Sequence, residues 1–196
     1  RSSTQTSSII TNCYNTGKII ALVSCAGGIV GFNLDAKNDR FSVNRCYNTG
    51  EISGPESVGG IIGRSANSIK TVIGCYNTGN ISGETNVGGI FGSAYPSCVI
   101  RQCYNTGAIT GTTKVGGICG SAIKYVNHCY NIGKLNCTKG GNIVGTTLGN
   151  SVGGIWNDFY QNGSSFPGVC DISDQVSGVI PKSEEYMKSQ DFVDLL

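Results

Sequence analysis

The chain has 196 residues, of which 39% are hydrophobic, 13% are charged and 30 are glycines, and its formal net charge is +2. The apolar fraction suffices for a packed interior and excludes a disordered chain, although charged residues usually make up about 25% of a globular domain. The positive charges form no basic run, so the electrostatic surface of a nucleic-acid-binding protein is missing. No apolar run reaches the roughly 18 residues of a transmembrane helix, so we expect no membrane insertion.

A sequence repeat begins at Cys13 and returns along most of the chain. Its most complete copy, CYNTGEISGPESVGGIIG, spans residues 46–63. The copies begin at Cys13, Cys46, Cys75, Cys103 and Cys129. Units this short cannot bury their own apolar face and must stack on their neighbours. Short alternating segments separated by Thr-Gly and Gly-Gly steps predict an all-β fold, a parallel β-solenoid (β-helix) of about five to six coils with three short strands each.

Three aliphatic columns predict the interior of the stack. They lie three residues before the cysteine (Ile10, Val43, Val72, Ile100, Val126), six residues after it (Ile19, Ile52, Ile81, Ile109, Leu135) and after the glycine pairs (Ile29, Ile61, Ile90, Ile118). The residue just before each cysteine is never aliphatic, so alternation turns the cysteine inward and the tyrosine outward. An inward cysteine packs as a small hydrophobe and lacks the accessible, electropositive setting of a nucleophile.

Glycine and asparagine recur at the predicted corners. Single glycines (Gly17, Gly50, Gly79, Gly107, Gly133) and pairs beginning at Gly27, Gly59, Gly88 and Gly116 indicate positive φ or close backbone approach. In the fifth unit Asn142 replaces the second glycine, and because asparagine tolerates left-handed geometry we expect that conformation there. The asparagines that follow the tyrosines are predicted to form an amide ladder along the stack: Asn15, Asn48, Asn77, Asn105 and Asn131.

The last part of the chain predicts the end of the stack. FYQNG, residues 159–163, is interpreted as a sixth rung, with Phe159 in place of the cysteine and Trp156 in the aliphatic column. We therefore assign residues 1–163 to the solenoid and residues 164–196 to a C-terminal cap. Ser183 as helix cap, acidic residues in the first turn, and Tyr186, Met187, Val193 and Leu196 at helical spacing predict a short helix. This segment either covers the last open strand edges or leads into a further domain.

Residues with catalytic or metal-binding chemistry are sparse. Asp35 and Asp39 share the longest return loop, and we expect Glu51 and Glu84 at equivalent turn positions, where other coils carry lysine or alanine. A solvated turn charge explains these acids better than a catalytic pair does. His128, the only histidine, lies in an outward position with a structural role.

No CxxC pair exists to hold zinc. Together with the scarcity of acids and the single histidine, this leads us to predict no catalytic residue, no metal and no cofactor. Disulfides joining Cys98 to Cys103, or Cys170 to another cysteine outside the column, stay open.

The tyrosine column is the best candidate for binding. Its predicted members are Tyr14, Tyr47, Tyr76, Tyr104, Tyr130 and Tyr160. Aromatic side chains with polar tips suit protein or sugar surfaces. The alternative is an intramolecular aromatic ladder that stiffens one wall of the stack.

The steps GGIVG, VGGIIG, VGGIFG and VGGICG, preceded by GEISG, GNISG and GAITG, resemble the GLUG motif over roughly residues 13–163. This glycine-rich repeat belongs to secreted and surface proteins of bacteria, beside immunoglobulin-A-cleaving metalloproteases and in large anchored surface proteins. The resemblance implies an extracellular β-solenoid, and the cysteine-rich CYN form implies a host that lives with little oxygen. The chain carries no HExxH, so the protease chemistry is not implied.

These observations lead to one expected function and two alternatives. We expect a non-catalytic extracellular or cell-surface module, a structural spacer with adhesin-like binding to a host or neighbouring-cell protein or glycan. The first alternative is a carbohydrate-active β-helix enzyme or its carbohydrate-binding module, which requires acids gathered over one wall. The second is self-association through the unpaired strand edge of the N-terminal coil.

Overall fold

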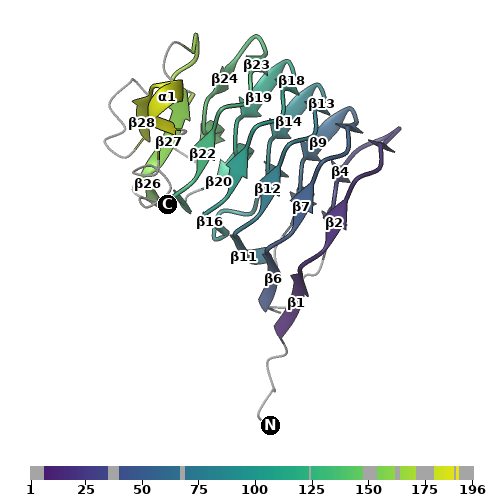
Figure 1. The fold of residues 1–196 in the computed structure, drawn as a ribbon. Helices are drawn as coiled ribbons and strands as arrows, with labels where there is room; N and C mark the ends of the chain where they lie inside the picture. The colour runs from purple at the N-terminus through teal and green to yellow at the C-terminus, as the bar shows by residue number, and fades with distance from the viewer. Residues whose placement is uncertain are drawn as a thin grey trace.

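The computed structural model describes residues 7–34, 40–66, 69–123, 125–147, 154–161, 164–170, 179–187 and 189. Within these residues the chain winds as a β-solenoid, and each coil stacks on the previous one through parallel strand pairing (Figure 1). Five parallel sheets run along the stack, and we name them sheets A to E in the order in which each coil passes through them. The predicted solenoid fold is therefore confirmed.

The strands of each sheet come from successive coils. Sheet A contains β1 (Ser7–Thr11), β6 (Arg40–Asn44), β11 (Ile69–Ile73), β16 (Val99–Arg101), β21 (Tyr125–Asn127) and β26 (Gly154–Trp156). Sheet B contains β2 (Tyr14–Asn15), β7 (Tyr47–Asn48), β12 (Tyr76–Asn77), β17 (Tyr104–Asn105), β22 (Tyr130–Asn131), β27 (Asp158–Gln161) and β28 (Val179–Lys182). Sheet C contains β3 (Ile19–Ile20), β8 (Ile52–Ser53), β13 (Ile81–Ser82), β18 (Ile109–Thr110) and β23 (Leu135–Asn136).

Sheets D and E complete each coil. Sheet D contains β4 (Ala26–Gly27), β9 (Glu56–Gly59), β14 (Thr85–Gly88), β19 (Thr113–Gly116) and β24 (Gly140–Gly141). Sheet E contains β5 (Val30–Asn33), β10 (Ile62–Ser65), β15 (Phe91–Ser93), β20 (Cys119–Ile123) and β25 (Val144–Thr147). The coil thus has five short strands where the sequence predicted three, because corners before each cysteine and inside each glycine pair divide the longer segments.

Two kinds of corner divide the strands. The residue before the cysteine has positive φ in every coil, from 51° at Arg45 to 63° at Gly74. The single glycines serve a different purpose, because a Cβ on Gly50 would lie 2.0 Å from the Gly17 carbonyl oxygen of the coil before it. Close approach was therefore predicted correctly for Gly50, Gly79, Gly107 and Gly133. Left-handed residues lie instead just before the cysteine and, in sheet D, at Ser57, Asn86 and Lys114.

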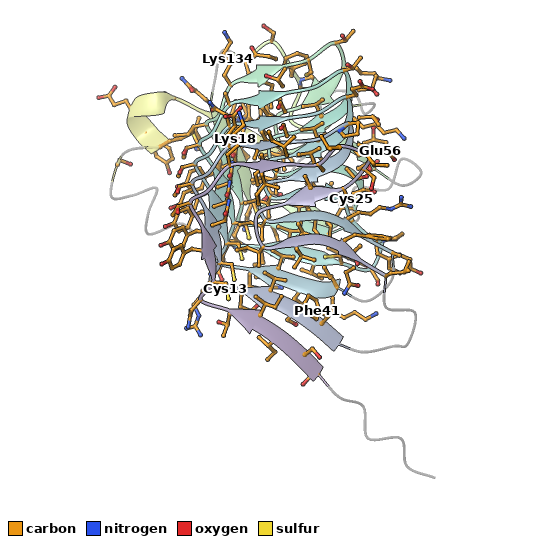
Figure 2. All side chains as sticks on the ribbon, turned by 90° about the vertical axis from the view of Figure 1, so that its right-hand side faces the viewer. Cys13, Lys18, Cys25, Phe41, Glu56 and Lys134 are labelled. Carbon is orange, nitrogen blue, oxygen red and sulfur yellow. The ribbon has the colours of Figure 1, made fainter. Side chains whose placement is uncertain are left out.

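The interior consists of two apolar clusters separated by a polar waist. Val43, Cys46 and Ile61 belong to the cluster enclosed by sheets A, B and E, and Ile52 belongs to the cluster between sheets C and D. Figure 2 looks onto the first coil and shows side chains filling the space inside the coils. Between the clusters the asparagine column is buried, with Asn48 fully inaccessible to solvent.

Glycine is required on the opposite side of this waist. A Cβ on Gly60 would lie 2.6 Å from Cγ of Asn77, and a Cβ on Gly89 would lie 2.5 Å from Cγ of Asn105. The second glycine of each pair therefore makes room for the asparagine of the next coil. This packing restricts the waist to glycine and asparagine in successive coils.

The exception at Asn142 has a different cause from the one expected. Asn142 does not have positive φ, so the prediction of left-handed geometry is wrong. The next coil has Tyr160 in the asparagine register, so no amide column requires a glycine there. Instead, Asn142 Nδ2 donates to the carbonyl oxygens of Phe166 and Pro167, and Ser164 Oγ donates to its Oδ1.

The sixth rung is shifted by one residue from the predicted alignment. Ile155 pairs with Val126 of the aliphatic column, and Trp156 does not. Phe159 pairs with Tyr130, so the phenylalanine continues the tyrosine column and is not in the cysteine position. Because a one-residue slip exchanges the two faces of a strand, Tyr160 takes the inward asparagine position.

The C-terminal segment covers the last coil. β28 pairs in parallel with β27, and Val169 forms a bridge with Val144 of sheet E. Helix α1 (Glu184–Met187) lies at this end of the stack (Figure 1), and Ser183 Oγ accepts the Tyr186 N–H at 3.1 Å, as predicted for the helix cap. Val193 and Leu196 lie outside the described residues. No helix in the described part of the chain is long and apolar enough to cross a membrane.

Replacing one amide of the waist should destabilise the whole stack. In Asn77→Ala, buried hydrogen-bonding groups of Asn48 and Asn105 lose their partner, which should lower the free energy of unfolding by about 2–4 kcal/mol. Urea unfolding followed by circular dichroism measures this change. Thr78→Ala, at the exposed neighbouring position, is the control and should change stability by less than about 0.5 kcal/mol. Equal losses in the two variants would contradict the ladder's role.

Candidate functional site: a tyrosine stripe beside a buried asparagine ladder

Five tyrosines form a continuous stack of rings on the outer face of sheet B. We call them the tyrosine stripe: Tyr14, Tyr47, Tyr76, Tyr104 and Tyr130. Successive ring centroids are 4.9–5.2 Å apart and the ring planes differ by 2–9°. The spacing follows the strand separation of the sheet, since Tyr76 pairs directly with Tyr47 and Tyr104. The sequence therefore located five members of the stripe correctly.

Tyr160 does not belong to the stripe. Its backbone pairs with Asn131, and its side chain packs, half-buried, against the core cluster of sheets A, B and E. Phe159 occupies the sixth stripe position, where it is buried against Met187 and contacts Tyr130 and Tyr186. The predicted site thus loses one member, because the strand register changes at the capping rung.

The stack leaves only parts of the rings accessible. The inner rings lie face to face, so their edges and hydroxyl groups, rather than their faces, meet solvent. Tyr14 is 63% exposed, whereas the cap covers the other end of the stripe. Burial raises the pKa of the Tyr104 hydroxyl, and it raises the pKa of Tyr130 to about 12. The stripe is therefore most accessible towards the first coil.

Behind the stripe, the asparagine ladder is confirmed. Each Nδ2 donates to the Oδ1 of the next coil, at 2.8 Å from Asn15 to Asn48, 2.7 Å from Asn48 to Asn77 and from Asn77 to Asn105, and 2.8 Å from Asn105 to Asn131. Each Nδ2 also donates within its own coil to the glycine carbonyl two residues on. Both amide hydrogens are thus used in the first four asparagines, which holds sheet B in register.

The cysteine column also faces inward, as predicted. Cys46, Cys75, Cys103 and Cys129 are buried, and only the first member, Cys13, is exposed. Each buried thiol donates to the carbonyl oxygen two residues before it, and the Sγ of Cys75 accepts the Cys46 N–H at 3.4 Å. Burial raises the pKa of Cys46 to about 11, so the column holds neutral thiols that pack and accept hydrogen bonds.

All ten cysteines are free in the structure, including Cys98 and Cys170, for which disulfides had stayed open.

One functional group of the column was missed in the sequence. Asp158 occupies the cysteine position of the sixth rung, is fully buried, and its Oδ1 accepts the Cys129 N–H at 2.8 Å. Its Oδ2 has no hydrogen-bond partner among the described residues. Burial raises the pKa of this carboxyl well above its usual range, opposed by the hydrogen bond from Cys129. The sequence did contain a signal for this position: Asp158 follows the aliphatic Ile155 by three residues, the spacing at which the cysteine follows the aliphatic residue in the other coils.

The remaining acids among the described residues do not gather into a site. Lys18 Nζ lies 3.1 Å from Glu51 Oε2 in an exposed ion pair of adjacent coils. The expected equivalence of Glu51 and Glu84 is wrong. The Glu84 N–H donates to the carbonyl oxygen of Pro55, and Ile81, which pairs with Ile52, places Asn80 opposite Glu51. In the part of the chain that the structure describes, no group of three or more His, Cys, Asp or Glu side chains could hold a metal ion.

Two other sequence candidates have different outcomes. His128 Nε2 lies 3.3 Å from Nδ2 of Asn157, its counterpart at the corner of the next rung. Asp35 and Asp39 lie outside the described residues.

Comparison with known proteins gives no match to a protein-family model, a curated protein or a solved structure. The similarity to the GLUG motif stays a prediction from the repeat residues.

The buried Asp158 should make stability depend on pH. The folded protein keeps the carboxyl proton that the unfolded chain releases near its ordinary pKa of about 4, so stability is full below that pH and falls as pH rises above it. Asp158→Asn removes the titrating group and should remove this fall. Urea unfolding of both proteins from about pH 4 to about pH 8 measures the difference, which should widen with pH.

Asp158→Cys is a matched variant, since it introduces the residue that the other coils have at this position. Its stability should also be insensitive to pH over this range. Parallel pH profiles for the wild type and both variants would show that Asp158 does not titrate as described.

Proposed function

We propose that this chain is a non-catalytic module of a bacterial extracellular or cell-surface protein. It serves as a rigid spacer and binds a host or neighbouring-cell surface protein or glycan through the tyrosine stripe. The observation that carries the binding proposal is the continuous stack of five rings on one outer wall. The extracellular setting rests on the resemblance of the repeats to the GLUG motif.

The spacer role is supported by bonding along the stack axis. Parallel strand pairs join each coil to the next in all five sheets, and the asparagine ladder adds side-chain bonds in the same direction. Repeat proteins of this kind gain stability from contacts between neighbouring units, so the described coils should bear load as one body. A stiff wall also orders the tyrosines before a partner arrives, which lowers the entropic cost of binding.

The geometry of the stripe favours one kind of contact. The inner tyrosine rings cover each other's faces, so they offer edges and hydroxyl groups to a partner. A protein surface or a row of sugar hydroxyls can accept and donate hydrogen bonds to such a wall. Stacking of a sugar ring is suited to Tyr14, which has a stripe neighbour on one side only among the described residues.

Removing hydroxyl groups from the stripe should weaken binding without disturbing the stack. The double variant Tyr47→Phe, Tyr76→Phe keeps both rings and removes two hydrogen-bonding groups, so we expect about tenfold weaker binding. Binding of the purified chain to arrays of surface glycans and to mucin glycoproteins measures the effect. Tyr95→Phe, outside the stripe, is the matched control and should bind as the wild type does.

Two results would contradict this proposal. One is the absence of binding to any glycan or mucin on the arrays, and the other is an equal loss in the Tyr95→Phe control. Hydrolysis of any polysaccharide by the purified protein would overturn the non-catalytic assignment and favour the carbohydrate-active alternative.

A second candidate function, self-association, is favoured by the surface of the first coil. Its exposed side chains include Leu22 at 88%, Val23 at 86% and Ile9 and Ile20 at 59% each. Large apolar side chains this exposed are typical of interaction sites. Because β28 and α1 cover the other end of the stack, head-to-tail growth is blocked there, and two copies would meet through their first coils as a symmetric dimer.

Charged residues in the first coil should dissociate this dimer. Light scattering after size-exclusion chromatography should give a dimer mass for the wild type and a monomer mass for Leu22→Asp, Val23→Asp, because the charges would be desolvated at the interface. Ile180→Ser, at the capped end, is the control and should stay dimeric. A wild-type protein that is monomeric at all concentrations tested would contradict self-association.

A further inference from the structure

A hollow of about 340 Å³ opens where the repeat gives way to the cap. Its walls come from the fifth coil, around Asn131 and Lys134, and from the segment that crosses the end of the stack, including Ser164 and Phe166. The hollow lies at the point where a sixth regular coil would have continued the asparagine ladder, because Asn131 is the ladder's last member. The change of register at Tyr160 thus ends the ladder at a cavity.

Asn131 leaves one donor of the ladder unused. The four preceding asparagines donate both Nδ2 hydrogens, one within the coil and one to the next amide. Asn131 Nδ2 donates to the Gly133 carbonyl oxygen at 3.0 Å, and its second hydrogen has no acceptor among the described residues. The side chain is 1% exposed, and its Oδ1 accepts from Asn105 behind it. The unused N–H therefore continues the ladder direction into the hollow.

The rest of the lining defines the ligand's chemistry. Among the described residues that line the hollow, Lys134 is the only charged one and none is acidic. Ile132, Leu135 and Phe166 contribute apolar surface beside these polar groups. A buried N–H, a nearby ammonium group and an apolar wall suit a ligand that combines an acceptor oxygen, a negative charge and a ring with C–H faces.

We propose that this hollow binds an acidic monosaccharide unit, a hexuronic acid. The unused Asn131 N–H donates to a ring or hydroxyl oxygen, Lys134 pairs with the carboxylate, and Phe166 packs against the C–H face of the ring. Pockets from about 300 Å³ upwards hold small ligands, so a single sugar ring fits. The site uses no tyrosine of the stripe and goes beyond the function proposed above.

The repeat supplies a matched control for the charged group. Lys18 occupies in the first coil the corner position that Lys134 occupies in the fifth, and Figure 2 labels both on the same side of the stack. Both lysines are exposed, so replacing either should leave the fold intact. Lys18 does not line the hollow.

Titrations of the purified chain with galacturonate and glucuronate test the proposal, with galactose and glucose as neutral counterparts. We expect saturable binding of at least one uronate, seen by NMR as a shift of the Asn131 side-chain amide, and roughly tenfold weaker binding in Lys134→Met but not in Lys18→Met. The neutral sugars should bind more weakly than the uronates.

Three outcomes would overturn the proposal: no saturable binding of either uronate, equal binding of the neutral sugars, or unchanged affinity in Lys134→Met. The stripe is tested separately, since Tyr47→Phe, Tyr76→Phe should leave uronate binding unchanged.

Discussion

The buried asparagine ladder constrains every coil, because a primary amide without solvent must find partners for both its hydrogens and its oxygen. In coils stacked in parallel and in register, one amide hydrogen reaches the glycine carbonyl of its own coil and the other reaches the amide of the next. A slip of one coil by a single residue would replace these bonds with unsatisfied groups. The ladder therefore specifies the register as well as contributing to stability.

The waist explains why the repeat tolerates so little variation at glycine. Gly60 and Gly89 face the amides of the following coil at distances that leave no room for a Cβ, so the backbone itself forms the second wall of the ladder. This arrangement divides the interior into two apolar clusters, each narrow enough to be filled by β-branched and other aliphatic side chains. Residue differences between the coils are therefore found in the return segments and on the outer faces.

The same register shapes the surface on which binding is proposed. Since asparagine and tyrosine alternate on a two-residue strand, an ordered inward ladder requires an ordered outward stack. The stack stiffens the wall and also hides most ring faces, which leaves hydroxyl groups and edges as the accessible chemistry. At the capping rung the repeat no longer supplies a partner for every buried polar group. The carboxyl of Asp158 and the last amide of the ladder are both found there.

The sequence by itself determined the solenoid, its aliphatic columns, the inward cysteines, the amide ladder and five of the six tyrosines, because each is repeated at the same position of several coils. When several copies are aligned, the alternation of inward and outward residues is clear even where one copy departs from it. Only the tertiary structure decided the ends and the corners. The left-handed residue at Arg45 looks like an ordinary surface position in sequence, and five strands instead of three follow from such corners. At the sixth rung a single non-repeating copy could be aligned in two registers, and the buried pairing of Ile155 with Val126 selected the one that puts Asp158 in the core.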